Sequence, residues 1–307
     1  MKVSSSFINL VTKSVAESMD VHTMVTLAKM FIHNYDLNKR TGIPENIPIQ
    51  KRDAAKQIVR DINQSNLLLH FICQLIEIKY VGLMAKKYNI IYLNKIIDEV
   101  LKLGFIFDSE NKMFVEDSNV RRTRNWGTLR EDEDYVFTFV RLDIVGNSKL
   151  VREYPDAIIK STYSDLRKIV DYAIDVREGR VWNWEGDGGL IAFYFSNKYQ
   201  LATLSAMEIA HELFMYNLSK CKLKKPLQVR IAVHGGLCGY TSDYEELMKN
   251  EVIKKTIEIE AKYTKPNTVT ISNMVGEAID ENLLKQFVLI KGEARSNYHN
   301  YELRWEK

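Results

Sequence analysis

The first 118 residues carry hydrophobic side chains at the three- and four-residue spacing of amphipathic helices, which predicts a mainly helical domain over residues 1–118. Residues 39–49 interrupt this pattern, because a glycine and two prolines there favour a loop. Residues 105–115 alternate, turn on polar residues and alternate again, so we expect a β-hairpin after the helices. The predicted helices cover residues 21–35, 52–62, 67–79 and 91–103.

Helices followed by a hairpin resemble a winged-helix arrangement, in which the third helix enters a DNA groove. The matching helix, residues 91–103, has Lys95 and Lys102 as its basic residues, with Asp98 and Glu99 beside them. A DNA-binding helix instead gathers lysine and arginine on one face. We therefore expect a regulatory or partner-docking domain whose regulator the sequence does not identify, and DNA binding is the alternative.

Residues 119–134 form a polar stretch with four arginines and an acidic run at its end, which is typical of a linker. The pattern changes beyond it. Residues 135–145 are an almost unbroken run of β-branched and aromatic side chains, as expected for a central strand covered on both faces. Residues 180–184 and 190–195 flank the sequence EGDGG, which is a signal for a tight hairpin.

Strands and helices interleave through the rest of the chain, so we expect an α+β domain with a mixed sheet over residues 135–307. Trp182 and Trp184 alternate along their strand and are expected on one face of it, in the core. His234 precedes two glycines at a strand end, and we expect a packing or turn role for it. Further helices are predicted over residues 163–174, 201–218 and 251–263, and further strands over residues 227–233, 268–271, 287–290 and 299–304.

Composition excludes several classes of protein. The chain has 307 residues with 43 basic and 40 acidic side chains, so its net charge of +3 gives no general attraction to nucleic acid. Its three cysteines are widely spaced, which indicates reduced thiols rather than disulfides or a zinc site. The longest apolar run, residues 67–76, is far shorter than the ~20 residues that span a membrane, and the N-terminus lacks a signal-peptide pattern. We therefore predict a cytoplasmic protein with neither a membrane nor a nucleic acid as partner.

Two aspartates occupy positions that need a bound cation. Asp143 interrupts an apolar strand just before it ends, and Asp187 lies at a hairpin tip between Gly186 and Gly188. A carboxylate at the end of a buried strand costs free energy unless a positive charge pairs with it. Oxygen ligands of this kind suit Mg²⁺ or Mn²⁺, which also bind water and substrate phosphates. Gly146, like Gly186, lets the backbone approach a triphosphate.

Five sequence segments occur in the order and approximate spacing seen in the catalytic domains of class III adenylate/guanylate cyclases. The chain therefore resembles this family over residues 135–305. The segments are RLDIVGNS (residues 141–148), WEGDGGLIAF (184–193), VRIAVHGG (229–236), AKYTKPNTVTIS (261–272), and VLIKG followed by YEL (288–292 and 301–303).

The resemblance implies a ferredoxin-like βαββαβ nucleotidyl cyclase core that works as a head-to-tail homodimer with active sites at the interface. It implies that Asp143 and Asp187, helped by the backbone carbonyl of Ile144, hold two Mg²⁺ or Mn²⁺ ions per site. A nucleoside triphosphate would then become a 3′,5′-cyclic nucleotide for intracellular signalling, with release of pyrophosphate in a two-metal displacement. The residues expected to bind the substrate are Ile144, Val145, Gly146, Asn147, Asn183 and Lys291.

The base-reading positions depart from the family pattern. Adenylate cyclases of this class carry lysine, and guanylate cyclases glutamate, where this chain has Asn183. An amide both donates and accepts hydrogen bonds, so ATP, GTP, CTP and UTP all stay open as substrates. The second base-reading position falls near Leu247, where Asp243 or Tyr244 is expected to substitute for the usual residue.

The groups that complete the site from the partner subunit depart as well. Family members use an asparagine and, four residues later, an arginine, where this chain has Lys254 and Glu258. Glu258 would repel a triphosphate, and Lys254 or Lys262 is expected to supply the positive charge, as a point charge rather than a planar fork. An ordinary surface pair between Lys254 and Glu258 is the alternative. The domain would then be a catalytically degenerate nucleotide-binding or protein-interaction module.

Overall fold

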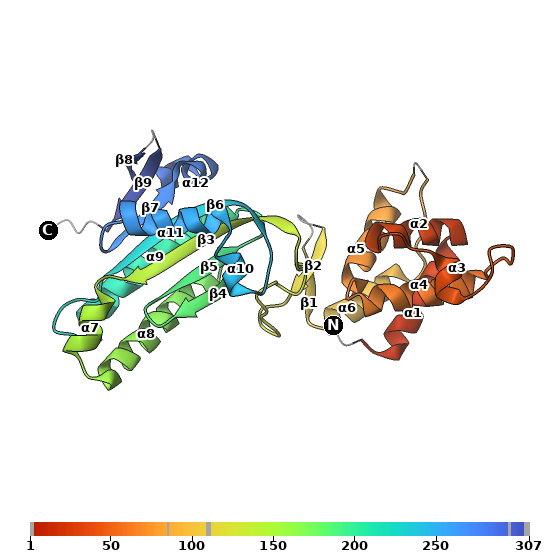
Figure 1. The fold of residues 1–307 in the computed structure, drawn as a ribbon, viewed down its shortest axis with the longest axis horizontal. Coiled ribbons are helices and arrows are strands. Elements are labelled where there is room, and N and C mark those ends of the chain that lie inside the picture. Colours follow the sequence, from red (N-terminus) through yellow and green to blue (C-terminus); the bar gives the residue numbers. More distant parts are fainter. Residues whose placement is uncertain (1–2, 85, 109–111, 294–295, 304–307) are drawn as a thin grey trace. The chain divides into compact units, whose positions relative to one another are not determined.

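The structure is a computed structural model that describes residues 3–84, 86–108, 112–293 and 296–303. The chain divides into two compact units, residues 1–128 and 129–307, and each has its own hydrophobic core (Figure 1). The boundary between the units falls inside the predicted linker, residues 119–134. No helix of the described residues is long and apolar enough to cross a membrane.

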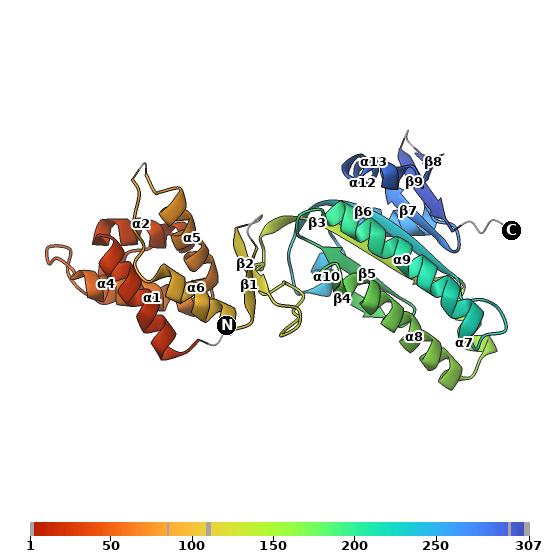
Figure 2. The ribbon, with the colours of Figure 1, turned by 180° about the vertical axis from the view of Figure 1, so that it is seen from behind.

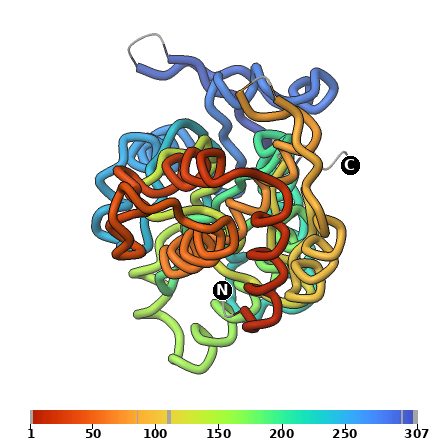
Figure 3. The backbone as a smooth tube through the Cα atoms, turned by 90° about the vertical axis from the view of Figure 1, so that its right-hand side faces the viewer, coloured from red at the N-terminus to blue at the C-terminus, as the bar shows by residue number. Residues whose placement is uncertain are grey.

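Helices and a two-stranded hairpin make up the first unit, and the helices gather into one cluster, red to orange in Figure 3. The helices cluster because each buries an apolar face. In helix α4 this face includes Ile58 and Val59, which are fully buried. The hairpin pairs Phe105 with Glu116, and residues 109–111 at its turn lie outside the described residues. The elements are α1 (Ser5–Ser18), α2 (Val21–Phe31), α3 (Leu37–Thr41), α4 (Lys51–Gln64), α5 (Leu68–Tyr80), α6 (Leu93–Lys102), β1 (Phe105–Asp108) and β2 (Met113–Glu116).

The sequence predictions omit α1 and place most of α3 in a loop. Helix α1 begins after Ser4, whose hydroxyl accepts a hydrogen bond from the Phe7 amide at 3.2 Å. Helix α3 ends at Gly42, which has φ +73° and so takes the left-handed conformation that closes a helix. The limits of a short helix such as α3 depend on its capping residues more than on hydrophobic spacing, so the hydrophobic pattern did not predict it.

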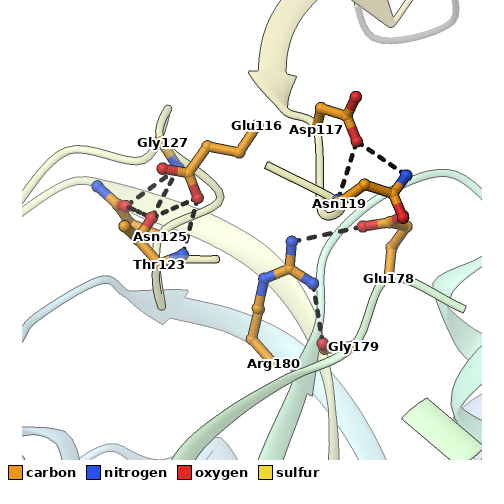
Figure 4. Close-up of polar contacts among 9 residues, drawn as sticks. All are labelled: Glu116, Asp117, Asn119, Thr123, Asn125, Gly127, Glu178, Gly179 and Arg180. Carbon is orange, nitrogen blue, oxygen red and sulfur yellow. Dashed lines mark hydrogen bonds and ion pairs between the residues drawn. The ribbon is translucent and has the colours of Figure 1, made fainter. Parts of the chain in front are cut away.

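A buried carboxylate organises the chain after the hairpin. Glu116 is 2% exposed and accepts hydrogen bonds from the Thr123 amide and hydroxyl, each at 2.8 Å (Figure 4). Arg121 pairs with the same carboxylate at 2.5 Å. A Cβ at Gly127 would lie 2.5 Å from the Glu116 Cγ, and its φ of +74° also favours glycine. Together with the fully buried Trp126, these contacts make residues 119–128 a packed part of the first unit.

The second unit is a mixed sheet with helices on both faces. Its strands lie in the order β4-β5-β3-β6-β7-β9-β8, with β6 and β7 parallel and the other neighbours antiparallel. The elements are β3 (Asp134–Ile144), α7 (Asn147–Glu153), α8 (Asp156–Asp175), β4 (Arg180–Glu185), β5 (Gly188–Phe193), α9 (Lys198–Ser219), β6 (Val229–Gly239), α10 (Tyr244–Leu247), α11 (Glu251–Glu258), the π-helix η1 (Ile259–Tyr263), β7 (Thr268–Ser272), α12 (Asn273–Ala278), α13 (Glu281–Leu284), β8 (Val288–Lys291) and β9 (Asn297–Glu302).

The segment from β3 to β6 confirms the predicted ferredoxin-like βαββαβ core. Its long elements follow one another as β3, α8, β4, β5, α9 and β6, and its strands lie antiparallel in the order β4-β5-β3-β6. Helices α8 and α9 cover one face of the sheet (Figure 2). Side chains of β3 such as Val140 and Leu142 are fully buried in the core with residues of α8 and α9. Phe137 and Phe139 point to the opposite face, so β3 is covered on both sides as its composition predicts.

A β-bulge corrects the prediction that Trp182 and Trp184 share one face of their strand. The pairing of β4 with β5 shifts between Val181 and Asn183, which adds a residue at Trp182. Trp182 therefore lies against Phe137 with ring centroids 4.7 Å apart and is 2% exposed. Trp184 packs on the α8 side, where the Arg167 guanidinium lies 4.7 Å from its ring centroid. Core packing of Trp182 is confirmed, and the shared face is wrong.

Other predicted elements differ in their limits. The helix predicted over residues 251–263 is α11 followed by η1, and the strand predicted over residues 299–304 is β9, which ends at Glu302. Arg304, the last residue of that prediction, lies outside the described residues. The short helices α7, α10, α12 and α13 were not predicted, because each has at most two turns and little apolar periodicity.

Candidate active site

The two aspartates singled out in the sequence lie on neighbouring strands at one end of the sheet. Asp143 is the penultimate residue of β3 and pairs with Gly188, the first residue of β5. Asp187 precedes Gly188 in the turn from β4, and its carbonyl accepts a hydrogen bond from the Ile144 amide at 3.0 Å. The backbones of the two aspartates are thus held side by side.

Strand β5 approaches β3 more closely here than a side chain would permit. A Cβ at Gly188 would lie 2.3 Å from the Leu142 carbonyl oxygen and 3.1 Å from the Asp143 Cα. Both are backbone atoms, so neither can turn away. A Cβ at Gly189 would lie 2.3 Å from the Trp184 ring. The two glycines after Asp187 therefore allow the spacing of the two carboxylates.

The chain after Asp143 forms a turn that leads into α7. Gly146 has φ +68° and ψ 30°, in the left-handed region, and its carbonyl accepts a hydrogen bond from the Lys149 amide at 2.9 Å. No heavy atom lies within 4 Å of a Cβ built there. The side-chain oxygen of Asn147 accepts a hydrogen bond from the Tyr163 hydroxyl on α8. Residues 144–147 thus lie directly beside Asp143 and Asp187, as a phosphate-binding turn would require.

Tyr163 joins this turn and the hairpin, and sequence reasoning missed it. Burial is the main cause that raises the pKa of Tyr163, and the negative charge of Asp187 raises it further. A Cβ at Gly186 would lie 3.8 Å from the Tyr163 ring, which places the ring against the hairpin tip. As the first residue of a predicted amphipathic helix, Tyr163 carried no signal of its own.

Two charged residues that face Asp143 were also missed. Arg230 on β6 donates a hydrogen bond from Nη2 to Asp143 Oδ2 at 2.8 Å. Its Nε lies 2.5 Å from Oε1 of Glu260, on η1. Glu260 is 4% exposed, and burial raises its pKa while the Arg230 charge lowers it. Arg230 belongs to the segment VRIAVHGG and could have been noticed there as a charge on a central strand. The position of Glu260 depends on the π-helix, which no sequence pattern shows.

The oxygen donors at Asp143 and Asp187 fit a divalent cation of the magnesium type. Carboxylate and carbonyl oxygens are hard ligands, and Mg²⁺ is often held by one or two carboxylates with water and phosphate completing its shell. Across the described ranges, no group of three or more acidic, histidine or cysteine side chains could hold a metal. An ion at Asp143 and Asp187 would therefore take its remaining ligands from the backbone, water or a substrate. The Arg230 guanidinium already provides Asp143 with a positive partner.

Asn183 lies two strands away from Asp143, on β4. Its side-chain amide donates a hydrogen bond to the Glu185 carboxylate at 2.9 Å. At the second predicted base-reading position, Leu247 is 4% exposed, and the Asp243 carboxylate accepts hydrogen bonds from two amides of α10 as its N-cap. Within one chain neither position contacts the pair of aspartates.

On helix α11, Lys254 and Glu258 each form ion pairs with other residues, and not with each other as one of the two expectations had it. Lys254 pairs with Glu251 at 2.7 Å rather than with Glu258, so the expected pair between Lys254 and Glu258 is wrong. Glu258 pairs with Lys255 at 2.9 Å and with Lys262 at 3.3 Å. Both pairs of Glu258 also lower its pKa. Its negative charge is thus balanced within the chain.

Lys291 ends β8, on the edge of the sheet beyond β6, β7 and β9 as seen from β3. Four strand spacings of about 4.8 Å put this edge about 19 Å from β3. Lys291 is also displaced along the strands. Ser272, at the end of β7 farther from Asp143, pairs with Tyr298 of β9, and Lys291 pairs with Asn297, one residue farther still. Lys291 and Asp143 therefore do not meet within one chain.

His234 lies on β6 with Nδ1 2.9 Å from the Ser272 hydroxyl oxygen. Burial is the main cause that lowers the pKa of His234 to about 4, and the Lys255 charge lowers it further. The imidazole is therefore neutral at pH 7. It lies four residues along β6 from Arg230, so it does not reach the aspartates.

No sequence profile of a known protein family matches this chain, and no curated protein matches it. Solved structures of cyclase domains are similar to it. The monomeric guanylyl cyclase domain of the RhoGC fusion protein from the aquatic fungus Blastocladiella emersonii is 13% identical, with a TM-score of 0.46, over 55% of this chain and 98% of that one. An adenylate/guanylate cyclase/hydrolase from Silicibacter pomeroyi is 19% identical, with a TM-score of 0.47, over 56% and 99%. The adenylyl cyclase CyaB from P. aeruginosa is 14% identical, with a TM-score of 0.46, over 56% and 96%. At these identities the likeness is one of fold.

Proposed function

We propose that the second unit converts a nucleoside triphosphate into a 3′,5′-cyclic nucleotide and pyrophosphate. The observation that carries this proposal is the side-by-side placement of Asp143 and Asp187, with the Gly146 turn directly after them. Two carboxylates and a glycine turn at one strand end suit divalent cations that carry a triphosphate. The five sequence segments in family order support the same reaction.

In the proposed reaction the ribose 3′-oxygen bonds to the α-phosphorus, and the bond from that phosphorus to the leaving pyrophosphate breaks. Divalent ions, when bound, would lower the pKa of the 3′-hydroxyl and neutralise the triphosphate. Asp143 and Asp187 would hold the ions, and the turn at residues 144–147 would orient the phosphates. Arg230, which pairs with both Asp143 and Glu260, would yield Asp143 to a bound ion and keep its pair with Glu260. The hydroxyl proton passes to water.

We further propose that two copies of the chain complete each site between them. The support is that Lys291 is separated from Asp143 by four strand spacings, about 19 Å, so one chain cannot place both on one triphosphate. Asn183 likewise lies two strands away from Asp143. A head-to-tail dimer would bring the Asp143 end of one copy to these residues of the other.

Incubation of the purified full chain with ATP, GTP, CTP or UTP and Mn²⁺ or Mg²⁺ tests the reaction. We expect one or more of them to give a cyclic nucleotide detectable by mass spectrometry. Asp143→Ala should abolish the product while the far-ultraviolet circular dichroism stays unchanged. A confirmed dimer that makes no product from any of the four would contradict the proposal.

Mixing two inactive variants tests the shared site. In a mixed dimer of Asp143→Ala and Lys291→Ala chains, one site carries both changes and the other carries neither. An equal mixture should therefore recover up to about a quarter of the wild-type turnover, since half of the dimers are mixed and each has one intact site. No recovery, with subunit exchange shown by labelled chains, would place both residues in one chain's site.

The alternative is a module that binds nucleotide without turnover. It is favoured by α11, which contains no arginine that could stabilise the transition state with a planar fork and whose Lys254 pairs with Glu251. Thermal stabilisation by a nucleoside triphosphate with Mn²⁺, combined with the absence of product, would support it.

A further inference from the structure

Glu260 is a buried carboxylate that pairs with Arg230, and Arg230 also pairs with Asp143 of the proposed metal site. Glu260 is 4% exposed, on a π-helix directly after α11, and Arg230 Nε lies 2.5 Å from its carboxylate. The other end of the same guanidinium donates to Asp143 at 2.8 Å. One arginine thus connects Glu260 to the carboxylate that is proposed to hold metal.

Burial of a carboxylate costs free energy, so a buried glutamate at this position suggests a function. An ion removed from water loses several kcal/mol of hydration in real proteins, and a buried ion pair often contributes little net stability. The π-helix gives η1 one residue more than an α-helical turn, and such insertions are frequent at functional sites. Ile259 beside Glu260 packs into a small cluster with Ala232 and Tyr298, which fixes this turn against the sheet.

Side chains of both charges lie around Asp143. Asp143, Asp187 and Glu260 are negative, and Arg230 is positive. Arg141, two residues before Asp143 on β3, also acts electrostatically on Glu260. A cation that binds Asp143 therefore competes with Arg230 for its carboxylate, and the strength of this competition depends on how strongly Glu260 holds the guanidinium.

We propose that Glu260 is a positioning residue of the metal site, which acts through Arg230 and sets the affinity of Asp143 for divalent cations. Glu260 draws the guanidinium toward η1 and keeps it there when a cation occupies Asp143. Without the Glu260 charge, Arg230 pairs with Asp143 alone and competes with the cation. This inference rests on the proposed function, because it assumes that Asp143 binds metal.

The two partners should therefore change metal affinity in opposite directions. Glu260→Gln leaves Arg230 competing at Asp143, and we expect Mn²⁺ to bind about tenfold more weakly. Arg230→Met removes the competing cation, and we expect Mn²⁺ to bind up to about tenfold more tightly. A purely structural role of the pair would weaken binding in both variants.

Isothermal titration of the full chain with Mn²⁺ alone measures these affinities without any turnover. Asp143→Asn shows that the measured ion is at the proposed site. Glu258→Gln is the matched control, because it makes the same change two residues earlier, at the end of α11, where Glu258 pairs with Lys255 and Lys262 instead. We expect the Mn²⁺ affinity of this control to equal that of the wild type.

The double variant Arg230→Met/Glu260→Gln removes both charges of the pair together, and where Arg230→Met alone fails to fold, it is compared with the wild type, whose Mn²⁺ affinity it should match or exceed. If Glu260 acts through Arg230, Glu260→Gln should have less than about a threefold effect in the Arg230→Met background. Equal effects in both backgrounds, or unchanged affinity in both single variants, would overturn the inference while the metal site stands. Wild-type binding that Asp143→Asn does not reduce, or no wild-type binding, would overturn the proposed site as well.

Discussion

Replacement of Gly188 by alanine should separate the two aspartates without touching either of them. The new Cβ would lie 2.3 Å from the Leu142 carbonyl oxygen, where a carbon and an oxygen of adjacent strands normally lie about 3.3 Å apart or more. The strands β3 and β5 would have to part by about 1 Å. Overpacking of this kind costs about 1–3 kcal/mol of unfolding free energy. Misplacement of a reacting group by about 1 Å can cost about 100-fold in rate.

Urea unfolding and product formation, measured on the same preparation, check both figures. Gly239→Ala is the matched control, because a Cβ there lies 3.3 Å from the Asp134 Oδ1, the end of a side chain that can turn away. It also lies at the opposite end of β3 from Asp143. We expect the control to keep its stability within about 0.5 kcal/mol. Wild-type stability and turnover in Gly188→Ala would refute the described contact between β5 and β3.

The pKa of His234 is about 4 in the folded chain and 6.5 in the unfolded chain, so between these values the unfolded chain binds more protons and stability falls as the pH falls. The wild type should lose about 2 kcal/mol more than His234→Gln between pH 7 and pH 5 in urea unfolding, and an equal loss would contradict this. Trp182→Ala should cost about 3–5 kcal/mol because Trp182 is 2% exposed against Phe137, and Trp184→Ala should cost clearly less because it is half-buried beside Arg167. Thermal unfolding of the two variants ranks them, and the reverse order would contradict the bulge.

Local patterns were sufficient for the core of the second unit. The apolar run at residues 135–145 predicts β3 because both of its faces are buried, and EGDGG predicts the β4–β5 hairpin because its turn needs small residues. The order of these elements then limits the topology, and the βαββαβ core follows. Asp143 and Asp187 could be singled out for the same reason, since each interrupts a strong local pattern.

What depends on tertiary arrangement could not be predicted. The insertion at Trp182 shifts the pairing with β5 and turns Trp184 to the other face, and alternation along one strand does not reveal it. The π-helix directs Glu260 toward Arg230, whereas an α-helical pattern over residues 251–263 does not. Lys291 follows a strand that the sequence locates, but its distance from Asp143 depends on the strand order of the sheet.

We propose above all that Asp143 and Asp187 form a metal-dependent site for cyclisation of a nucleoside triphosphate. The most direct measurement is ³¹P nuclear magnetic resonance of the full chain with the preferred triphosphate and Mg²⁺, which observes both products of one reaction. We expect the cyclic phosphodiester and pyrophosphate to appear in equal amounts with the wild type, and neither to appear with Asp143→Ala or Asp187→Ala. Pyrophosphate without the cyclic product, or unchanged product formation by either variant, would contradict the claim.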